Sequence, residues 1–165
     1  MNGFLYCCLL GFGLPFYAQE IQNNKPTTQI EILYNQALNL SYQENFSAAL
    51  PLFDSLIAMN AQIDLLFFDR GMIKKHLGDF SGAILDFSEQ IKQTPQDADA
   101  YFLRGELLLQ EGNFRAAYND LKMVTKADAG NADAHCYLAK AAAELGKSFV
   151  EKRHSKYCKA NLHIH

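Results

Sequence analysis

Residues 67–87 read FFDRGMIKKHLGDFSGAILDF, and residues 101–121, which begin 34 positions later, read YFLRGELLLQEGNFRAAYNDL. The two stretches carry apolar, small and turn-forming residues at the same places. Without any insertion, the same register of 34 residues starts at four positions along the chain, Ile30, Asp64, Ala98 and Ala132. A repeat of this length is typical of helical hairpins that stack into a solenoid. The sequence therefore predicts four consecutive helix–turn–helix units without a strand.

Small residues recur where the two helices of a hairpin must approach each other. The eighth position of the repeat holds Ala37, Gly71, Gly105 and Ala139, and the twentieth holds Ala49, Ala83, Ala117 and Glu151. The turn reads Gly-Asp-Phe at 78–80 and Gly-Asn-Phe at 112–114. Glycine can end one helix in the left-handed conformation, and Asp or Asn can cap the next helix. The apolar column that closes the second helix against the first holds Phe53, Phe87, Leu121 and, in the fourth repeat, Ser155.

These residues, together with Pro95 at the end of the second repeat, make residues 30–165 resemble the tetratricopeptide repeat family. The resemblance implies an all-α, right-handed α-solenoid of helix–turn–helix hairpins, with repeats at 30–63, 64–97, 98–131 and 132–165. Two repeats depart from the pattern. Pro51 falls inside the second helix of the first repeat, which we expect it to kink or shorten. Glu151 and Ser155 predict a degenerate or capping fourth repeat.

The first eighteen residues, MNGFLYCCLLGFGLPFYA, form a separate segment. Their uncharged apolar run is shorter than a bilayer span and is typical of a secretory signal peptide, with cleavage expected between Ala18 and Gln19. Residues 19–29 are polar and predict a flexible spacer. We therefore expect export to the periplasm or cell envelope of a bacterium, with membrane contact only through the leader before cleavage. The alternative is an uncleaved helix that packs on the first repeat.

Charge is distributed unevenly along the chain. Residues 1–146 contain ten basic and seventeen acidic residues, whereas residues 147–165 contain five and one. The basic tail could contact phosphate, but the expectation is a solvated helix that closes the solenoid. No phosphate-binding glycine loop or nucleophile motif is present in the sequence. We expect no enzyme activity, no cofactor, no nucleic-acid partner and no small-molecule substrate.

Histidines and cysteines near the C-terminus are candidate metal ligands. His154 and Cys158 lie four residues apart, and His163 and His165 could join them, but the set lacks a carboxylate that would orient it. We expect no metal site. A disulfide between Cys136 and Cys158 would suit an exported protein, but their positions in the repeat favour two unpaired thiols that pack as small apolar groups.

Recurring charges at two positions predict contacts within a repeat. Arg70 and Arg104 occupy the seventh position, and Asp86 and Asp120 occupy the twenty-third. We expect one ion pair between the two helices of each central repeat. If partly exposed, such a pair contributes about 0–1 kcal/mol, so it sets the register of the hairpin more than its stability.

Function, by the resemblance, belongs to a concave groove lined by the first helix of each repeat. The fifth position there holds Tyr34, Phe68, Phe102 and Cys136, the acidic residues nearby are Glu31, Asp69, Asp99 and Asp133, and the ninth position includes Met72 and Glu106. Such a surface predicts a non-catalytic adaptor for a protein, bound as a peptide or helix with apolar anchors and basic residues. Two alternatives stay open. The rings could be buried between repeats, or the chain could be an assembly subunit of an envelope complex that associates through its terminal repeats.

Overall fold

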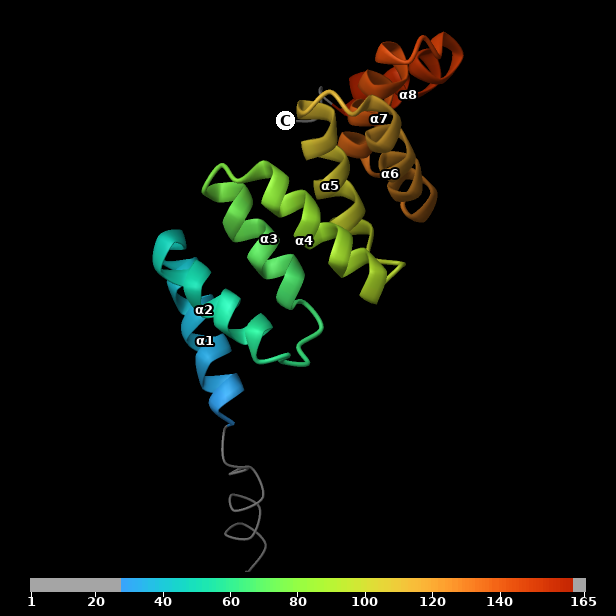
Figure 1. The fold of residues 1–165 in the computed structure, drawn as a ribbon. Coiled ribbons are helices and arrows are strands. Elements are labelled where there is room, and N and C mark those ends of the chain that lie inside the picture. Colours follow the sequence, from blue (N-terminus) through green and yellow to red (C-terminus); the bar gives the residue numbers. More distant parts are fainter. Residues whose placement is uncertain (1–27, 162–165) are drawn as a thin grey trace, which may run out of the picture.

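The structure, a computed structural model, describes residues 28–161, so the leader predicted at residues 1–18 and most of the predicted spacer lie outside the described part. Eight helices and no strand follow one another over that range: α1 (Gln29–Tyr42), α2 (Phe46–Ala58), α3 (Leu66–His76), α4 (Phe80–Gln93), α5 (Ala98–Gln110), α6 (Phe114–Ala127), α7 (Ala132–Glu144) and α8 (Ser148–Asn161). Consecutive helices form four hairpins that stack into a right-handed solenoid (Figure 1). The predicted all-α solenoid is confirmed.

The ends of the helices follow the turn residues of the repeat. Gly78, Gly112 and Gly146 have φ angles of 81°, 77° and 67°, the left-handed region that glycine adopts without a steric penalty. At the corresponding place in the first repeat, Glu44 takes a φ of 57°. In each turn the residue after this position donates its backbone N–H across the helix end, for example from Asp79 to the carbonyl of Lys74 at 2.9 Å. This bond is the one that closes a helix in the Schellman motif.

Both terminal repeats form hairpins despite their irregular residues. The α2 helix continues through Pro51 and is 13 residues long against 14 for α4, so the proline shortens it by one residue at most. Helix α1 begins at Gln29 with Thr28 as its cap, so these two residues of the predicted spacer belong to the start of the first hairpin. The fourth repeat forms a hairpin of its own from α7 and α8. Within the described residues, no helix combines the length and apolar character that a membrane crossing requires.

The core runs along the contact between the eighth and twenty-fourth positions of each repeat. Phe53, Phe87 and Leu121 are 0% exposed. A Cβ atom added at Gly71 would lie 2.9 Å from the ring of Phe87, and one at Gly105 would lie 3.0 Å from Leu121. The small residue at the eighth position is therefore required because a large side chain of the second helix packs directly on the backbone of the first.

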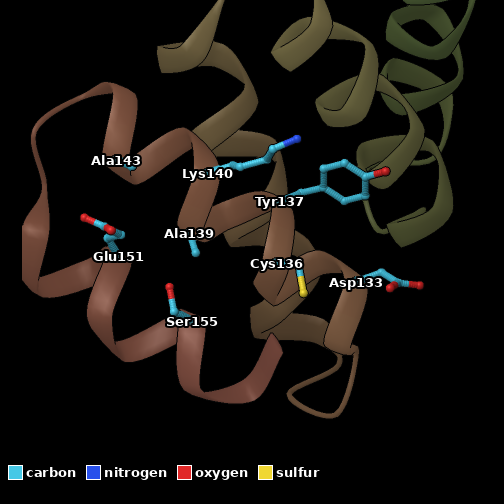
Figure 2. A pocket seen from close by; sticks show the side chains of 8 residues that line it. All are labelled: Asp133, Cys136, Tyr137, Ala139, Lys140, Ala143, Glu151 and Ser155. Carbon is cyan, nitrogen blue, oxygen red and sulfur yellow. The ribbon is translucent and has the colours of Figure 1, made fainter. Parts of the chain in front are cut away.

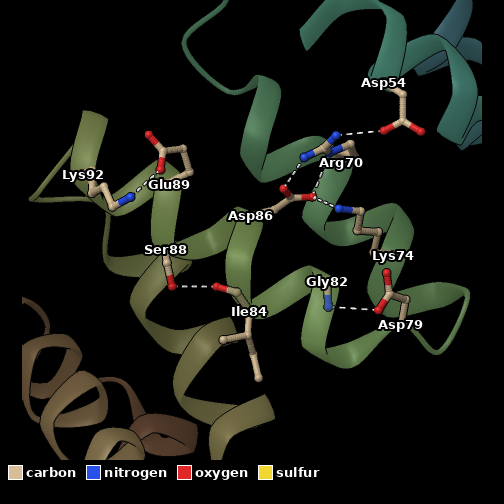
Figure 3. Close-up of polar contacts among 10 residues, drawn as sticks. All are labelled: Asp54, Arg70, Lys74, Asp79, Gly82, Ile84, Asp86, Ser88, Glu89 and Lys92. Atoms are coloured by element: carbon tan, nitrogen blue, oxygen red, sulfur yellow. Dashed lines mark hydrogen bonds and ion pairs between the residues drawn. The ribbon is translucent and has the colours of Figure 1, made fainter. Parts of the chain in front are cut away.

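The ion pairs predicted within the two central repeats are present, and their carboxylates are buried. Figure 3 shows the pair of the second repeat. The guanidinium of Arg70 donates to both carboxylate oxygens of Asp86, at 2.6 and 2.9 Å, and Lys74 pairs with the same carboxylate at 2.9 Å. Only 4% of the Asp86 side chain is exposed. Arg70 also donates to Asp54 of the preceding repeat at 2.8 Å.

The third repeat repeats this arrangement. Arg104 donates to both oxygens of Asp120 at 2.7 and 2.8 Å, and to the hydroxyl of Ser88 in the preceding repeat at 3.0 Å. Ser88 stands 34 residues after Asp54. The arginine column therefore connects neighbouring repeats as well as the two helices of one repeat. Because the carboxylates are buried, removing one costs more than the surface value considered for partly exposed pairs.

Candidate protein-binding groove

The aromatic residues predicted for the groove lie on the first helices of three successive hairpins. Tyr34 on α1, Phe68 on α3 and Phe102 on α5 are each half-buried. Tyr34 meets the ring of Phe53 edge-on at 6.3 Å between centroids, and Phe68 lies 5.7 Å from Phe87. Each of these two rings therefore covers the core of its own repeat with one side and keeps a part of its surface accessible.

Phe102 has a different neighbour. Its ring lies 5.6 Å from that of Tyr137, at an interplanar angle of 73°, and Tyr137 belongs to α7 of the next repeat. This pair joins the inner surfaces of the third and fourth repeats. Rings at this separation and angle attract each other edge to face.

Two of the predicted acidic residues are engaged by neighbouring repeats. The hydroxyl of Tyr34 donates to Asp69 at 2.5 Å. Burial and the hydrogen bond to Asp69 raise the pKa of Tyr34 well above its ordinary value of 10.0. Burial raises the pKa of Asp69 as well, and the hydrogen bond from Tyr34 opposes that rise. Asp69 therefore connects α3 with α1 on the predicted groove surface.

Glu106 makes the corresponding connection further along. It accepts a hydrogen bond from the ammonium of Lys75 on α3 at 2.5 Å and one from the hydroxyl of Tyr137 on α7 at 3.2 Å. Its side chain links three consecutive hairpins. Burial and then the charge of Glu106 raise the pKa of Tyr137.

The remaining acidic residues lie at the beginnings of helices. Glu31 accepts from the backbone N–H of Thr28 at 2.8 Å, as part of a capping box. Asp99 and Asp133 stand in the first turns of α5 and α7 and are exposed. Glu31 is exposed as well, whereas Asp69 and Glu106 are half-buried.

Hollows open near both ends of the row of first helices. The N-terminal cavity has a volume of about 370 Å³ and lies between the first two hairpins, with Leu38, Phe46, Asp69, Met72 and His76 among its walls. The ring of Phe46 stacks on that of His76 at 4.4 Å, so the aromatic residue of the first turn reaches the second repeat.

The C-terminal cavity, of about 550 Å³, lies in the fourth repeat between α7 and α8 (Figure 2). Its walls are Asp133, Cys136, Tyr137, Ala139, Lys140, Ala143, Glu151 and Ser155. Two of these, Asp133 and Cys136, were predicted groove residues. The cavity therefore joins the predicted groove surface to the contact between the last two helices.

Several residues of these surfaces were not among the predicted ones. Lys75 occupies the twelfth position of its repeat, Lys140 the ninth and Tyr137 the sixth. The ninth and twelfth positions face inward in this kind of repeat, so Lys75 and Lys140 follow from the register. The contact of Tyr137 with Glu106 depends on the angle between adjacent hairpins, which the register does not give.

Cys136 is disulfide-bonded in the structure. The expectation of an unpaired thiol at this position is therefore wrong. It rested on the position of Cys136 in a single repeat, which shows the face that the side chain takes but not how closely another sulfur approaches. The predicted groove thus ends in a disulfide rather than in a thiol.

A cluster of rings that the sequence did not predict joins α7 and α8. The rings of His154 and Tyr157 stack on that of His135, at 4.8 and 4.4 Å. His135 and His154 share a hydrogen bond of 2.5 Å between their Nδ1 atoms, and Nε2 of His135 donates to the carbonyl of Ala129 at 3.1 Å. His135 is 5% exposed. Burial, then the neighbouring His135 and Arg153, lower the pKa of His154.

Metal coordination has no counterpart in the described part of the chain. Within it, no three His, Cys, Asp or Glu residues gather as a metal would require. Two of the histidines that were weighed as ligands, His163 and His165, lie outside the described residues.

Comparison with known proteins agrees with this architecture. A sequence model described as the tetratricopeptide repeat matches residues 34–97 and 68–121. Among solved structures, MamA AMB-1 superimposes with a TM-score of 0.77 at 12% identity, over 88% of this chain and 80% of that one. The MamA RS-1 ArsTM double mutant gives 0.74 at 17% identity, over 80% and 75%.

A third solved structure is that of YrrB, described as a TPR protein with an unusual peptide-binding site. It gives a TM-score of 0.72 at 19% identity, over 87% of this chain and 73% of that one. At these identities the likeness concerns the fold. No curated protein matches the chain.

The fold defines a helical-repeat protein, a class built to present extended surfaces rather than an enclosed reaction site. Because the sequence model spans more than half of its length, this chain belongs to the tetratricopeptide repeat family. Proteins of this family generally serve as interaction modules without catalytic activity of their own.

Proposed function

We propose that this protein is a non-catalytic adaptor that binds a peptide or helix of a partner protein along the inner surface of α1, α3, α5 and α7. The observation that carries the proposal is the row of half-buried rings, Tyr34, Phe68 and Phe102, on the first helices of three successive hairpins. One cavity opens between the first two hairpins and another in the fourth repeat. Rings that keep part of their surface accessible offer apolar contact area at a low cost in conformational entropy.

Charge favours a partner with basic residues near its apolar anchors. Asp99 and Asp133 are exposed and can meet a cation directly. Asp69 and Glu106 are already engaged by Tyr34 and Lys75, so a partner gains less from them. Instead, these two carboxylates fix the position of each first helix relative to that of the next repeat.

Capture from an envelope extract tests the proposal, with the double variant Phe68→Ala and Phe102→Ala beside the wild type. We expect loss of a specific partner, mainly through faster dissociation, at about 1–3 kcal/mol for a central anchor. A matched control replaces two exposed apolar residues of the second helices, Leu85→Ala and Met123→Ala, which are 71% and 44% exposed.

Thermal melting of both double variants separates binding from folding. The reasoning holds if the groove variant keeps a cooperative transition and loses the partner while the control retains it. If the groove variant unfolds without a selective loss of partner, the rings act as core. That outcome would refute the groove.

A second candidate is end-to-end assembly, and the charge of the two ends favours it. Residues 28–64 contain four acidic and no basic residues, whereas residues 147–165 contain five basic and one acidic. Opposite ends of this kind attract each other at low ionic strength. Sedimentation at low and high salt tests this role, and a monomer under both conditions excludes it.

For the location of the protein we propose export, in the periplasm or cell envelope of a bacterium. The apolar run within residues 1–18 and the disulfide of Cys136 support it, since disulfides persist in oxidising compartments. N-terminal sequencing of protein from an envelope fraction tests it. A mature chain that begins at or near Gln19 is expected, and an intact Met1 chain in the cytoplasm contradicts export.

A further inference from the structure

The C-terminal cavity occupies the place where a large side chain stands in the other repeats. The twenty-fourth position holds Phe53, Phe87 and Leu121 in the first three repeats, and each is fully buried against the small residue at the eighth position. In the fourth repeat these two positions hold Ser155 and Ala139, and both line the cavity.

We propose that the C-terminal cavity is a socket for one bulky apolar side chain of a protein partner, flanked in that partner by basic residues. The inference rests on the proposed adaptor function and names the chemistry of its ligand. In the first three repeats the chain supplies the large side chain from its own second helix. In the fourth the partner supplies it.

The size and shape of the cavity suit this role. Its volume of about 550 Å³ falls within the roughly 300–1,000 Å³ typical of ligand pockets. Ala139 and Ala143 line it from α7 and provide apolar contacts, while Ser155 faces them from α8 (Figure 2). The Asp133 and Cys136 side of the cavity belongs to the predicted groove surface, so a segment bound in the groove can reach it.

The charges around the cavity select a cation next to the apolar group. Glu151 replaces the fully buried alanine of Ala49, Ala83 and Ala117, and it is half-buried at the cavity wall. Within the described residues its carboxylate has no hydrogen bond or ion pair.

Asp133 adds a second carboxylate, and Lys140 is the one basic residue of this wall. In Figure 2 the Lys140 side chain extends away from Glu151. Among the residues that line the cavity, two acidic groups and one basic group leave an excess of negative charge, although α8 is basic elsewhere. This local excess favours a cation placed next to the apolar group.

The test uses the full chain and three five-residue peptides of matched length. One has phenylalanine between two lysines, the second has phenylalanine between two glutamates, and the third has alanine between two lysines. We expect the first peptide to bind at least tenfold more tightly than either of the others, by isothermal titration or by shifts of the Ala139 and Ala143 methyl signals.

A larger side chain at position 155 would fill the socket. It should stabilise the fold and weaken peptide binding, so the two effects can be told apart. Ser155→Phe and Ser155→Leu restore the side chains of the other repeats. They should raise the melting temperature while lowering the affinity for the first peptide at least tenfold. Glu151→Gln should lower that affinity about threefold at low salt and less at high salt, because salt screens exposed charges.

Several outcomes overturn the socket. If both Ser155 variants raise the melting temperature and the first peptide binds as before, the cavity is a packing gap. If that peptide binds nowhere, or binds equally with glutamate in place of lysine, the stated chemistry is wrong. If affinity rises when residues 162–165 are deleted, the occupant is the tail of this chain.

Two further results separate this inference from the function on which it rests. If Ser155→Phe abolishes self-association in sedimentation, the occupant is a second copy of the chain rather than a partner peptide. If the partner captured from the extract is lost with Phe68→Ala and Phe102→Ala but retained with Ser155→Phe, the adaptor function stands and the socket fails.

Discussion

Replacement of Gly71 by alanine tests the packing on which every hairpin of this solenoid depends. The new Cβ would lie 2.9 Å from Cε1 and 3.1 Å from Cδ1 of Phe87, closer than carbon atoms pack. Phe87 is 0% exposed, so its ring is enclosed by other protein atoms and can move aside only if they move as well. Overpacking of this kind costs about 1–3 kcal/mol, and alanine regains about 0.5–1 kcal/mol over glycine inside a helix. We expect a net loss of about 0–2.5 kcal/mol in the free energy of unfolding.

Urea denaturation of a double-mutant cycle measures this effect. Phe87→Leu reproduces the leucine that faces Gly105 in the third repeat, where Leu121 stands. The smaller side chain should make room for alanine, so the double variant should be more stable than the sum of the single effects predicts, by at least about 0.5 kcal/mol.

The first repeat pairs Ala37 with Phe53, both fully buried, so a hairpin can accommodate this pair when its helices are spaced for it. The double-mutant cycle therefore measures how much free energy is needed to move α3 and α4 apart. Strict additivity of the two changes, or a Gly71→Ala variant that is more stable than the wild type, would refute the reasoning.

Three further predictions concern an ion pair, a histidine and a disulfide. Asp86→Ala should cost up to about 3–5 kcal/mol in urea denaturation, because Arg70 loses its buried carboxylate and keeps only the half-exposed Asp54 as a partner; a loss below about 1 kcal/mol, the value of a surface pair, contradicts this. The melting temperature should fall as pH drops below 6.5, because the lowered pKa of His154 makes the unfolded chain take up the proton first; His154→Phe should flatten this dependence, and an equally steep fall in that variant excludes His154 as its cause. Finally, Cys136 should resist alkylation until a reductant is added, as judged by peptide mass spectrometry, whereas labelling without reductant contradicts the disulfide.

Local features of this chain were predictable because each repeat encodes them in a short stretch. The turns at Gly78 and Gly112 follow from residues that tolerate a positive φ and from the capping residues beside them. The pairing of Arg70 with Asp86 follows from two columns that face each other inside one hairpin. Such contacts depend on helix geometry alone, which the 34-residue register specifies.

The candidate site was predictable only in part. The register placed Tyr34, Phe68 and Phe102 on one surface, but it did not show that Asp69 is held by Tyr34 or that Glu106 connects Lys75 with Tyr137. Those contacts join residues of different repeats, and they depend on the angle and distance between adjacent hairpins.

The sequence by itself determined the number of hairpins, their turns and the small residues where the helices cross. Each of these features belongs to a single repeat, and the repeat occurs four times along the chain. Only the tertiary structure decided what the irregular positions do. Ser155 and Glu151 predicted a degenerate or capping repeat, and in the structure α7 and α8 form a hairpin with a cavity at the place that a large side chain fills in the other repeats. Where a large side chain is missing, the neighbouring helices either move together or leave a cavity. Which of the two happens depends on how the surrounding helices pack.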